Sequence, residues 1–165
     1  MRTILMVAIT MSGILMELDA IGSNLIDALC KVESNNNATA VGDKGKAKGI
    51  LQIHKICVDD VNRIYGTKYV HDDAFNVEKA RKICELYLLH YGKAYIKRTG
   101  KNPTELDLAR IWNAGPKGYE KASTLAYADK VGKVLQGTGR KAIVRKAVKK
   151  DITGLHVFPK NLQKS

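Results

Sequence analysis

The chain has 165 residues, and its 28 lysines and arginines against 16 aspartates and glutamates give it a formal net charge of +12. This length predicts one domain rather than several, with a core that needs no disulfide or metal, and a hydrophobic content of 45% is ordinary for a globular protein. The charge predicts attraction to polyanions such as cell-wall polymers, anionic lipid or nucleic acid, but it does not choose among them.

The first 20 residues have the pattern of a targeting segment. Arg2 precedes an uncharged run over residues 4–16, which is short for a membrane span and suits the apolar region of a signal peptide. A cleavage site after Ala20 would remove it. The alternatives are an uncleaved membrane anchor and a first core helix. We expect export, with the folded domain over residues 21–136.

Apolar residues recur at helical spacing over 25–32. Glu33 follows Ile26 by seven residues and Leu29 by four, which predicts that it projects from the apolar face near the helix C-terminus. Burial and the negative end of the helix dipole both disfavour an ionised carboxylate there. A carboxyl that stays protonated near neutral pH is what a general acid needs. The alternative is a glutamate that swings out to solvent.

Residues 35–45 are polar and rich in asparagine and glycine, which predicts a turn region or a small hairpin. Asp43 lies in this region, and its simplest interpretation is a turn aspartate. Helical spacing resumes over 53–65, with residues 56, 57, 61 and 64 predicted to face inward. Gln52 stands at the start of this helix, where its amide could bind a sugar acetamido group or cap the helix.

Two helices are predicted in the next part of the chain. The cleanest apolar stripe covers 77–91, and a frayed, basic continuation of the helix followed by a loop is expected over 93–102. Thr104 and Asp107 have the spacing of a capping box, which predicts a helix that runs through Trp112.

Side chains near the end of that helix, and in the one that follows, are candidates for a site. Aromatic faces stack on sugar rings, and we predict that Trp112 lines the core with one edge in a cleft. Asn113 could hydrogen-bond either a sugar or the backbone. A last helix is predicted over about 124–135, and spacing alone places its Tyr127 in the core.

The three cysteines, Cys30, Cys57 and Cys84, form no Cys-x-x-Cys motif and have no histidine cluster beside them, so a metal site is not expected. Buried free thiols are the favoured state for all three. In an exported protein a single disulfide between Cys57 and Cys84 is the alternative.

Residues 137–165 are predicted to form a basic C-terminal extension. Lysines and arginines over 140–150 alternate with Ile143, Val144 and Val148 in a weak amphipathic pattern. The pattern predicts either a solvated helical face or electrostatic contact with anionic cell wall, a membrane surface or nucleic acid.

Four short motifs, in this order, resemble those of the bacterial lytic transglycosylases and goose-type lysozymes. They are Glu33-Ser34, Gly49-Ile50-Leu51-Gln52, Trp112-Asn113-Ala114-Gly115 and Tyr127, against Glu-Ser, Gly-Leu-Met-Gln, Ala-Tyr-Asn-Ala-Gly and a late Tyr in that family. The resemblance covers residues 23–135. It implies a mainly α, lysozyme-like (α+β) fold with a small β-hairpin or loop at the active-site cleft.

The resemblance also implies roles for individual residues. Glu33 would be the catalytic acid. The Gly-Asp-x-Gly turn is closer to the goose-type lysozymes, where such an aspartate helps to position the attacking water, and this maps to Asp43. His54 stands where that family has a second acidic residue. The residues expected to bind substrate are Ser34, Gln52, Trp112, Asn113 and Tyr127.

We therefore expect a monomeric lytic transglycosylase or muramidase that cleaves the β-1,4 bond between N-acetylmuramic acid and N-acetylglucosamine in peptidoglycan. It would act in the periplasm or outside the cell, or be phage-encoded and act at the cell wall. Glu33 would protonate the leaving oxygen, and either the muramoyl 6-hydroxyl or a water held by Asp43 would attack. Neither route needs a metal or cofactor.

Two other interpretations stay open at this point. The first is a non-catalytic module on the same fold that binds cell-wall glycan or another polyanion. The second, a nucleic-acid-binding protein, rests on charge alone, because the sequence has no aromatic–basic motif; no specific nucleic acid is expected as a partner.

Overall fold

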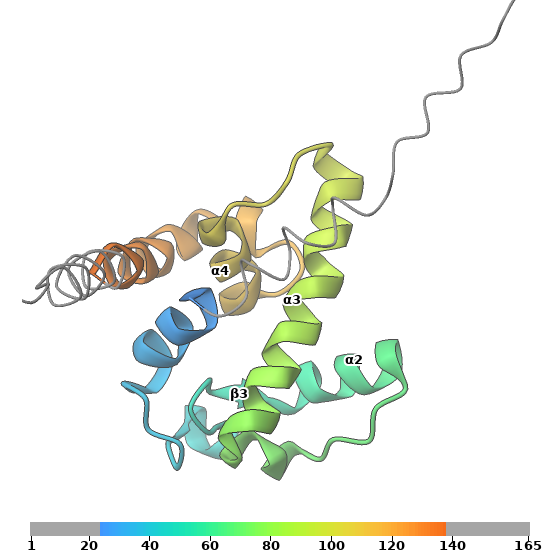
Figure 1. Ribbon diagram of the computed structural model, residues 1–165, viewed down its shortest axis with the longest axis vertical. Helices are drawn as coiled ribbons and strands as arrows, with labels where there is room; N and C mark the ends of the chain where they lie inside the picture. Colours follow the sequence, from blue (N-terminus) through green and yellow to red (C-terminus); the bar gives the residue numbers. More distant parts are fainter. Residues whose placement is uncertain (1–23, 138–165) are drawn as a thin grey trace, which may run out of the picture.

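Figure 1 shows the computed structural model of the chain, which describes residues 24–137. The expected targeting segment and the basic stretch over 140–150 lie outside the described residues. Helix 24–34 comes first, and a last helix is described over 125–137. Between them lie β1 (Val41–Gly42), β2 (Ala47–Lys48), β3 (Ile53–His54), α2 (Lys55–Tyr65), α3 (Val77–Thr99) and α4 (Glu105–Ala114). Short 3-10 turns occupy η1 (Asp43–Gly45), η2 (His71–Phe75), η3 (Gly118–Glu120) and η4 (Ala122–Thr124). The predicted mainly helical, lysozyme-like fold with a small β element is confirmed.

The long helix α3 is the element against which the others pack. In Figure 1 α4 lies beside its upper part, while the sheet and α2 lie at its lower end. Apolar side chains from the helices meet in one core, among them Leu29, Ile83, Ile111 and Val131. Within residues 24–137 no helix has the length and apolar character needed to cross a membrane.

Helix α3 is longer than the apolar stripe predicted. It continues to Thr99, so the continuation expected after residue 92 is an ordinary helix over most of 93–102, and the loop is shorter than expected. Lysine, alanine and arginine are good helix formers, and they extend the helix without an apolar face. Gly92 is buried inside it, where an added Cβ would lie 3.3 Å from Leu108, so the glycine lets α4 approach closely. Gly100, with φ of 70°, ends the helix.

Helix α2 begins later than predicted, and its inward face agrees with the prediction at Val61 but not at Ile56. Residues 53–54 pair as β3, so the helix starts at Lys55. Its buried residues are Val58 and Val61, whereas Ile56 is 74% exposed, so the inward prediction for Ile56 is wrong. The reason lies in tertiary packing, because Val58 and Val61 join the core while residues 56 and 57 line a cleft.

The small sheet has the antiparallel order β1-β2-β3. Gly42 lies opposite Ala47, and Ala47 lies opposite His54. These three residues form one row across the sheet. Because Asp43 follows Gly42 directly, the register brings the η1 turn and the end of β3 to the same side of the domain.

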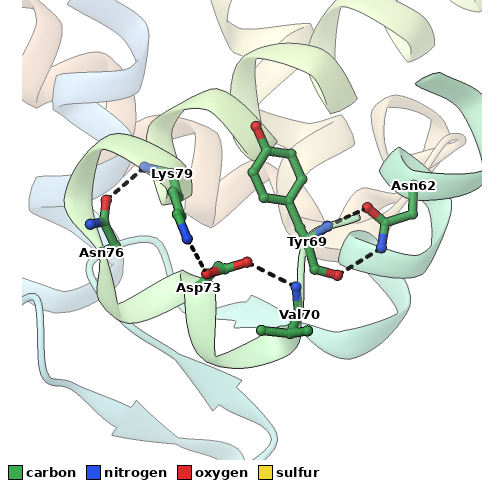
Figure 2. A network of polar contacts seen from close by, with 6 residues as sticks. All are labelled: Asn62, Tyr69, Val70, Asp73, Asn76 and Lys79. Carbon is green, nitrogen blue, oxygen red and sulfur yellow. Dashed lines mark hydrogen bonds and ion pairs between the residues drawn. The ribbon is translucent and has the colours of Figure 1, made fainter. Parts of the chain in front are cut away.

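The segment between α2 and α3 is held by a polar network (Figure 2). The Asn62 side chain donates to the carbonyl of Tyr69 at 2.8 Å and accepts from its N–H at 2.9 Å. Asp73 accepts from the N–H of Val70 at 2.9 Å and from Lys79 at 2.7 Å. Side chains thus satisfy backbone groups that the segment's irregular path leaves without ladder partners.

The same segment supports the sheet. The Nε2 atom of His71 lies 2.8 Å from the carbonyl oxygen of Ile53, which ties η2 to β3. Gly49, with φ of 72°, packs directly on the backbone of Ala74, where a Cβ would come within 2.5 Å of the carbonyl carbon. Only glycine combines this conformation with so close an approach. The turn before β3 is therefore clamped against η2.

Candidate active site

A cleft of about 560 Å³ opens between the sheet and the helices. It is lined by residues of helix 24–34, the η1 turn, β3, α2, α3 and the end of α4. Five of the seven site residues expected from the sequence line it, namely Glu33, Asp43, Gln52, Trp112 and Asn113. The chain thus folds motifs that are up to 80 positions apart around one concave surface.

Glu33 is half-buried at the C-terminal end of its helix and faces the cleft. Burial raises the pKa of its carboxyl, while hydrogen bonds from Tyr127 and from the Trp112 indole lower it, and the net effect is a raised pKa. The apolar-face argument anticipated this direction. The carboxyl thus keeps its proton to a higher pH than an exposed glutamate does.

Tyr127 is the residue that contacts Glu33 most closely. Its hydroxyl donates to Oε1 of Glu33 at 2.6 Å, a contact between residues 94 positions apart. Burial and the neighbouring carboxylate both raise the pKa of Tyr127, so its hydroxyl stays a donor at any physiological pH. The ring packs against the core, as spacing predicted, while the hydroxyl reaches the site.

Trp112 lies both against the core and at the cleft, as predicted. It packs against the core, with its ring edge-on to Tyr87 at 5.7 Å between centroids, and it also lines the cleft. The indole N–H of Trp112 also has a polar role. It hydrogen-bonds the Glu33 carboxylate and so lowers the pKa of that carboxyl. Asn113 follows at the exposed rim.

The Ser34 side chain forms hydrogen bonds with the backbone. Its hydroxyl donates to the carbonyl of Ile50 at 2.8 Å and accepts from the N–H of Asn37 at 3.0 Å. These bonds join the end of the first helix to the Gly49–Gln52 turn, and Ser34 is not among the residues that line the cleft. In this geometry it holds the two motifs together.

Gln52 also engages the backbone. Its Nε2 group donates to the carbonyls of Gly49 at 2.9 Å and Ala40 at 3.2 Å, so both amide hydrogens have partners. Its Oε1 lies against Gly42, where it would overlap any Cβ. Gln52 lines the cleft, and the amide oxygen is the part of the side chain without a hydrogen bond to the described protein.

Asp43 and His54 meet at the sheet side of the cleft. The Oδ2 atom of Asp43 lies 3.7 Å from Nε2 of His54, and both side chains line the cleft while remaining roughly half exposed. Sequence reasoning predicted a site role for Asp43 only. The signal for His54 was its position two residues after Gln52, where the resembling family has an acid.

Two residues that line this cleft, Asp43 and Gln52, adopt a left-handed backbone conformation. In the described part of the chain, the non-glycine residues with positive φ are Asn35, Asn36, Asp43, Lys44 and Gln52. A left-handed conformation costs roughly 1–2 kcal/mol for residues other than glycine, asparagine and aspartate. Lys44 and Gln52 are therefore the strained residues, and strain of this kind is characteristic of functional sites.

Comparison with known proteins adds an independent finding. The chain is similar to a lysozyme from Ostrea edulis, with 29% identity over 132 residues that cover 77% of this chain and 90% of that protein. No protein-family model matches the chain. The likeness supports a lysozyme-like family. It does not distinguish lytic transglycosylases or goose-type lysozymes within that family.

The cleft contains a third carboxylate that sequence reasoning missed. Asp60, on α2, accepts from the Tyr91 hydroxyl at 2.5 Å and from Arg63 at 2.7 Å. Burial alone would raise the pKa of Asp60, but the hydrogen bonds from Arg63 and Tyr91 outweigh it and hold the pKa below its ordinary value. The available signal was helical spacing, because Asp60 follows Ile56 by four residues and Cys57 by three, and all three line the cleft.

The cysteines are free thiols, the favoured alternative, and Cys57 and Cys84 form no disulfide. Cys57 lines the cleft, but burial raises its pKa to about 12, so it stays a protonated, unreactive thiol. Among residues 24–137 no three histidine, cysteine or acidic side chains converge in a way that could hold a metal ion.

Proposed function

We propose that this protein is a peptidoglycan-cleaving glycosidase of the lysozyme type, with Glu33 as its general acid. The observation that carries the proposal is the half-buried Glu33 carboxyl, whose pKa is raised, at the wall of an open cleft. Such a carboxyl delivers a proton to a leaving oxygen at a pH where an exposed glutamate is already ionised. The likeness to a lysozyme supports the same activity.

The bond to be cleaved is the β-1,4 bond between N-acetylmuramic acid and N-acetylglucosamine. Glu33 protonates the glycosidic oxygen as that bond breaks, and the departing sugar leaves as an alcohol. Tyr127 stabilises the resulting carboxylate through the hydrogen bond to Oε1. Trp112 and Asn113 line the cleft where sugar rings would lie, and the free amide oxygen of Gln52 is available to a substrate N–H or hydroxyl.

Two nucleophiles can complete the reaction. In a lytic transglycosylase the muramoyl 6-hydroxyl attacks and gives a 1,6-anhydro end. In an inverting muramidase a water molecule attacks with the help of a second carboxylate. This mechanism needs the acid and the second carboxylate on one cleft, about 6.5–9.5 Å apart. We favour the muramidase route because Asp43 lines the same cleft as Glu33.

The proposed substrate also fits the charge of the chain. Glycan strands are embedded in anionic wall polymers, and a net charge of +12 attracts the enzyme to them. We propose that the protein acts as a monomer at the cell wall after export or phage-mediated release, and that the basic extension over 137–165 adds electrostatic contact with wall or membrane.

The decisive experiment is digestion of purified peptidoglycan, with mass analysis of the products, by the wild type and by Glu33→Gln. The amide is nearly isosteric but has no proton to give, so the rate should fall by about 10²–10⁴-fold with the fold intact. Glu78→Gln, an exposed glutamate in the first turn of α3, is the matched control and should cleave normally.

Two results would contradict the proposal. If Glu33→Gln clears wall substrate at nearly the wild-type rate, Glu33 is not the acid. If the wild type binds peptidoglycan but releases no fragments, the domain is the non-catalytic binding module that the sequence left open.

A further inference from the structure

We propose that the Asp60 carboxylate forms a separate sugar subsite on the α2 wall of the cleft, where it accepts hydrogen bonds from the hydroxyl groups of a neutral sugar unit. The subsite rests on the proposed function, because its ligand is part of the glycan that the cleft would cleave. Asp60 lies outside the four motifs that resemble those of the lytic transglycosylases, and its role would be to bind glycan rather than to transfer a proton.

Asp60 is the last residue of α2 that lines the cleft, after Ile56 and Cys57. The helix begins at Lys55, directly after β3, and leads away from the sheet (Figure 1). One helical turn, a rise of about 5–6 Å, separates Asp60 from Ile56. The α2 wall therefore extends the cleft beyond the sheet, and a sugar unit held by Asp60 would lie further along the glycan than one bound at the sheet.

Two helices fix the direction of the Asp60 carboxylate. Its Oδ2 accepts from the Tyr91 hydroxyl of α3 at 2.5 Å, and its Oδ1 accepts from Arg63 of α2 at 2.7 Å. The Tyr91 ring in turn packs on Tyr87, with 4.6 Å between ring centroids, and Tyr87 lines the cleft. An acceptor held in this way loses little conformational entropy when a ligand binds, which favours binding.

The carboxylate keeps unused acceptor capacity at the cleft. An ionised carboxylate has about four acceptor positions, and within residues 24–137 Asp60 makes two hydrogen bonds, one on each oxygen. Its side chain is 26% exposed, so ligand atoms can reach it. Partial burial also removes some of the water that would otherwise satisfy the remaining positions, and donors on a ligand would replace that water.

The charge around Asp60 favours hydroxyl donors over a cationic ligand. The hydrogen bonds from Arg63 and Tyr91 hold the pKa of Asp60 below its ordinary value, so the side chain stays ionised and can only accept. The Arg63 guanidinium compensates its charge at short range, which weakens any net attraction for an ammonium group. Hydrogen bonds from O–H groups to a carboxylate are of the strong, charge-assisted kind, and a sugar ring carries hydroxyl groups side by side.

A purely structural role for Asp60 is the alternative, since the contact with Tyr91 joins α2 to α3. That role requires the hydrogen bond between the two side chains but no acceptor facing the cleft. The two roles therefore differ in what a substitution changes. A structural residue affects the melting temperature alone, whereas a subsite residue also affects glycan affinity.

The test measures the affinity for a peptide-free peptidoglycan octasaccharide in the Glu33→Gln background, which is expected not to cleave it. Trp112, the single tryptophan of the chain, lines the cleft, so its fluorescence should report binding. Asp60→Asn keeps the shape of the side chain but replaces charge-assisted hydrogen bonds with neutral ones. We expect it to raise Kd by about tenfold, and Tyr91→Phe, which removes one of the two anchors, to raise Kd by about threefold.

Asp59→Asn is the matched control for Asp60→Asn. Asp59 is the neighbouring aspartate on α2, it also pairs within the helix, with Lys55 at 2.7 Å, and it lies outside the cleft lining. The control changes the net charge by the same amount and should leave Kd unchanged. In the cleaving enzyme, with Glu33 intact, Asp60→Asn should raise KM by about tenfold and leave kcat within about threefold, because the subsite binds ground state and transition state alike.

Each outcome bears on one conclusion. An unchanged Kd and KM in Asp60→Asn, or an equal change in Asp59→Asn, refutes the subsite, and a lowered melting temperature alone would assign Asp60 the structural role. If a de-N-acetylated octasaccharide binds more than about tenfold tighter and Asp60→Asn removes this preference, the ligand is a cationic sugar and the neutral-sugar assignment is wrong. A protein with intact Glu33 that binds the octasaccharide through Asp60 but releases no fragments refutes the proposed cleavage and leaves the subsite in place. Absence of binding refutes both.

Discussion

Replacing Tyr127 by phenylalanine removes one oxygen atom from the site and leaves the packing of the ring in place. The missing hydroxyl is the donor 2.6 Å from Oε1 of Glu33. Of the influences on the Glu33 pKa, burial is the largest and raises it, and the Tyr127 hydrogen bond is the next and lowers it. In Tyr127→Phe the pKa-raising effect of burial is no longer countered by this hydrogen bond, so the pKa of Glu33 should rise further.

The size of this rise follows from the free energy of the hydrogen bond. A hydrogen bond to a charged group contributes about 1.5–3 kcal/mol, and one pKa unit corresponds to about 1.4 kcal/mol. The full effect would be about 1–2 units, and the partial exposure of Glu33 to the cleft favours the lower figure. Because protonated Glu33 is the active form, the alkaline limb of the rate profile should move to higher pH by about one unit.

The assay is the initial rate of wall clearing between pH 4 and 10 for the wild type and Tyr127→Phe, at fixed ionic strength. Tyr65→Phe is the matched control, because it also loses one hydroxyl hydrogen bond, to the carbonyl of Leu86, away from the cleft. Its alkaline limb should not move. An unmoved limb in Tyr127→Phe, or a limb shifted to lower pH, would refute the assignment of Glu33 as the acid that Tyr127 regulates.

The remaining predictions concern stability. Because folding raises the pKa of Glu33, the stability tied to its protonated form is complete below the unfolded pKa and is lost as pH rises through the folded pKa. The melting temperature of Glu33→Gln should therefore rise relative to that of the wild type between pH 4 and pH 8. A constant difference between the two melting temperatures would contradict this. Gly49→Ala should lower the free energy of unfolding in urea by about 2–4 kcal/mol, because the added Cβ meets the backbone of Ala74. Gly45→Ala has open space around the added Cβ and should lower it by only about 1 kcal/mol. Equal losses in the two variants would refute the packing of Gly49 against η2. Asn62→Ala removes three hydrogen bonds, to Thr67 and to both backbone groups of Tyr69, and should cost about 2–3 kcal/mol, whereas a loss below about 0.5 kcal/mol would mean that water replaces them.

Local sequence patterns determined several features of this protein directly. The apolar stripe before Glu33 predicted both its helix and the burial of its carboxyl, because helical periodicity assigns each residue to a face. The capping box is present as predicted, since Thr104 and Asp107 bond each other's backbone N–H groups and depend only on residues three apart. Signals of this kind are short-range, so the sequence by itself is enough to find them.

Tertiary packing decided the features that depend on distant partners. Spacing placed Tyr127 in the core, and only the fold brings its hydroxyl to Glu33, 94 positions away. Ser34 and Gln52 were expected to bind substrate, and packing engages the Ser34 hydroxyl and the Gln52 amide nitrogen with backbone carbonyls, which leaves the Gln52 amide oxygen for a ligand. His54 reached the cleft because the sheet aligns it in one row with Ala47 and Gly42, and Asp43 follows Gly42 directly. A side chain's periodic face follows from its own segment, but its hydrogen-bond partner is set by how separate segments pack.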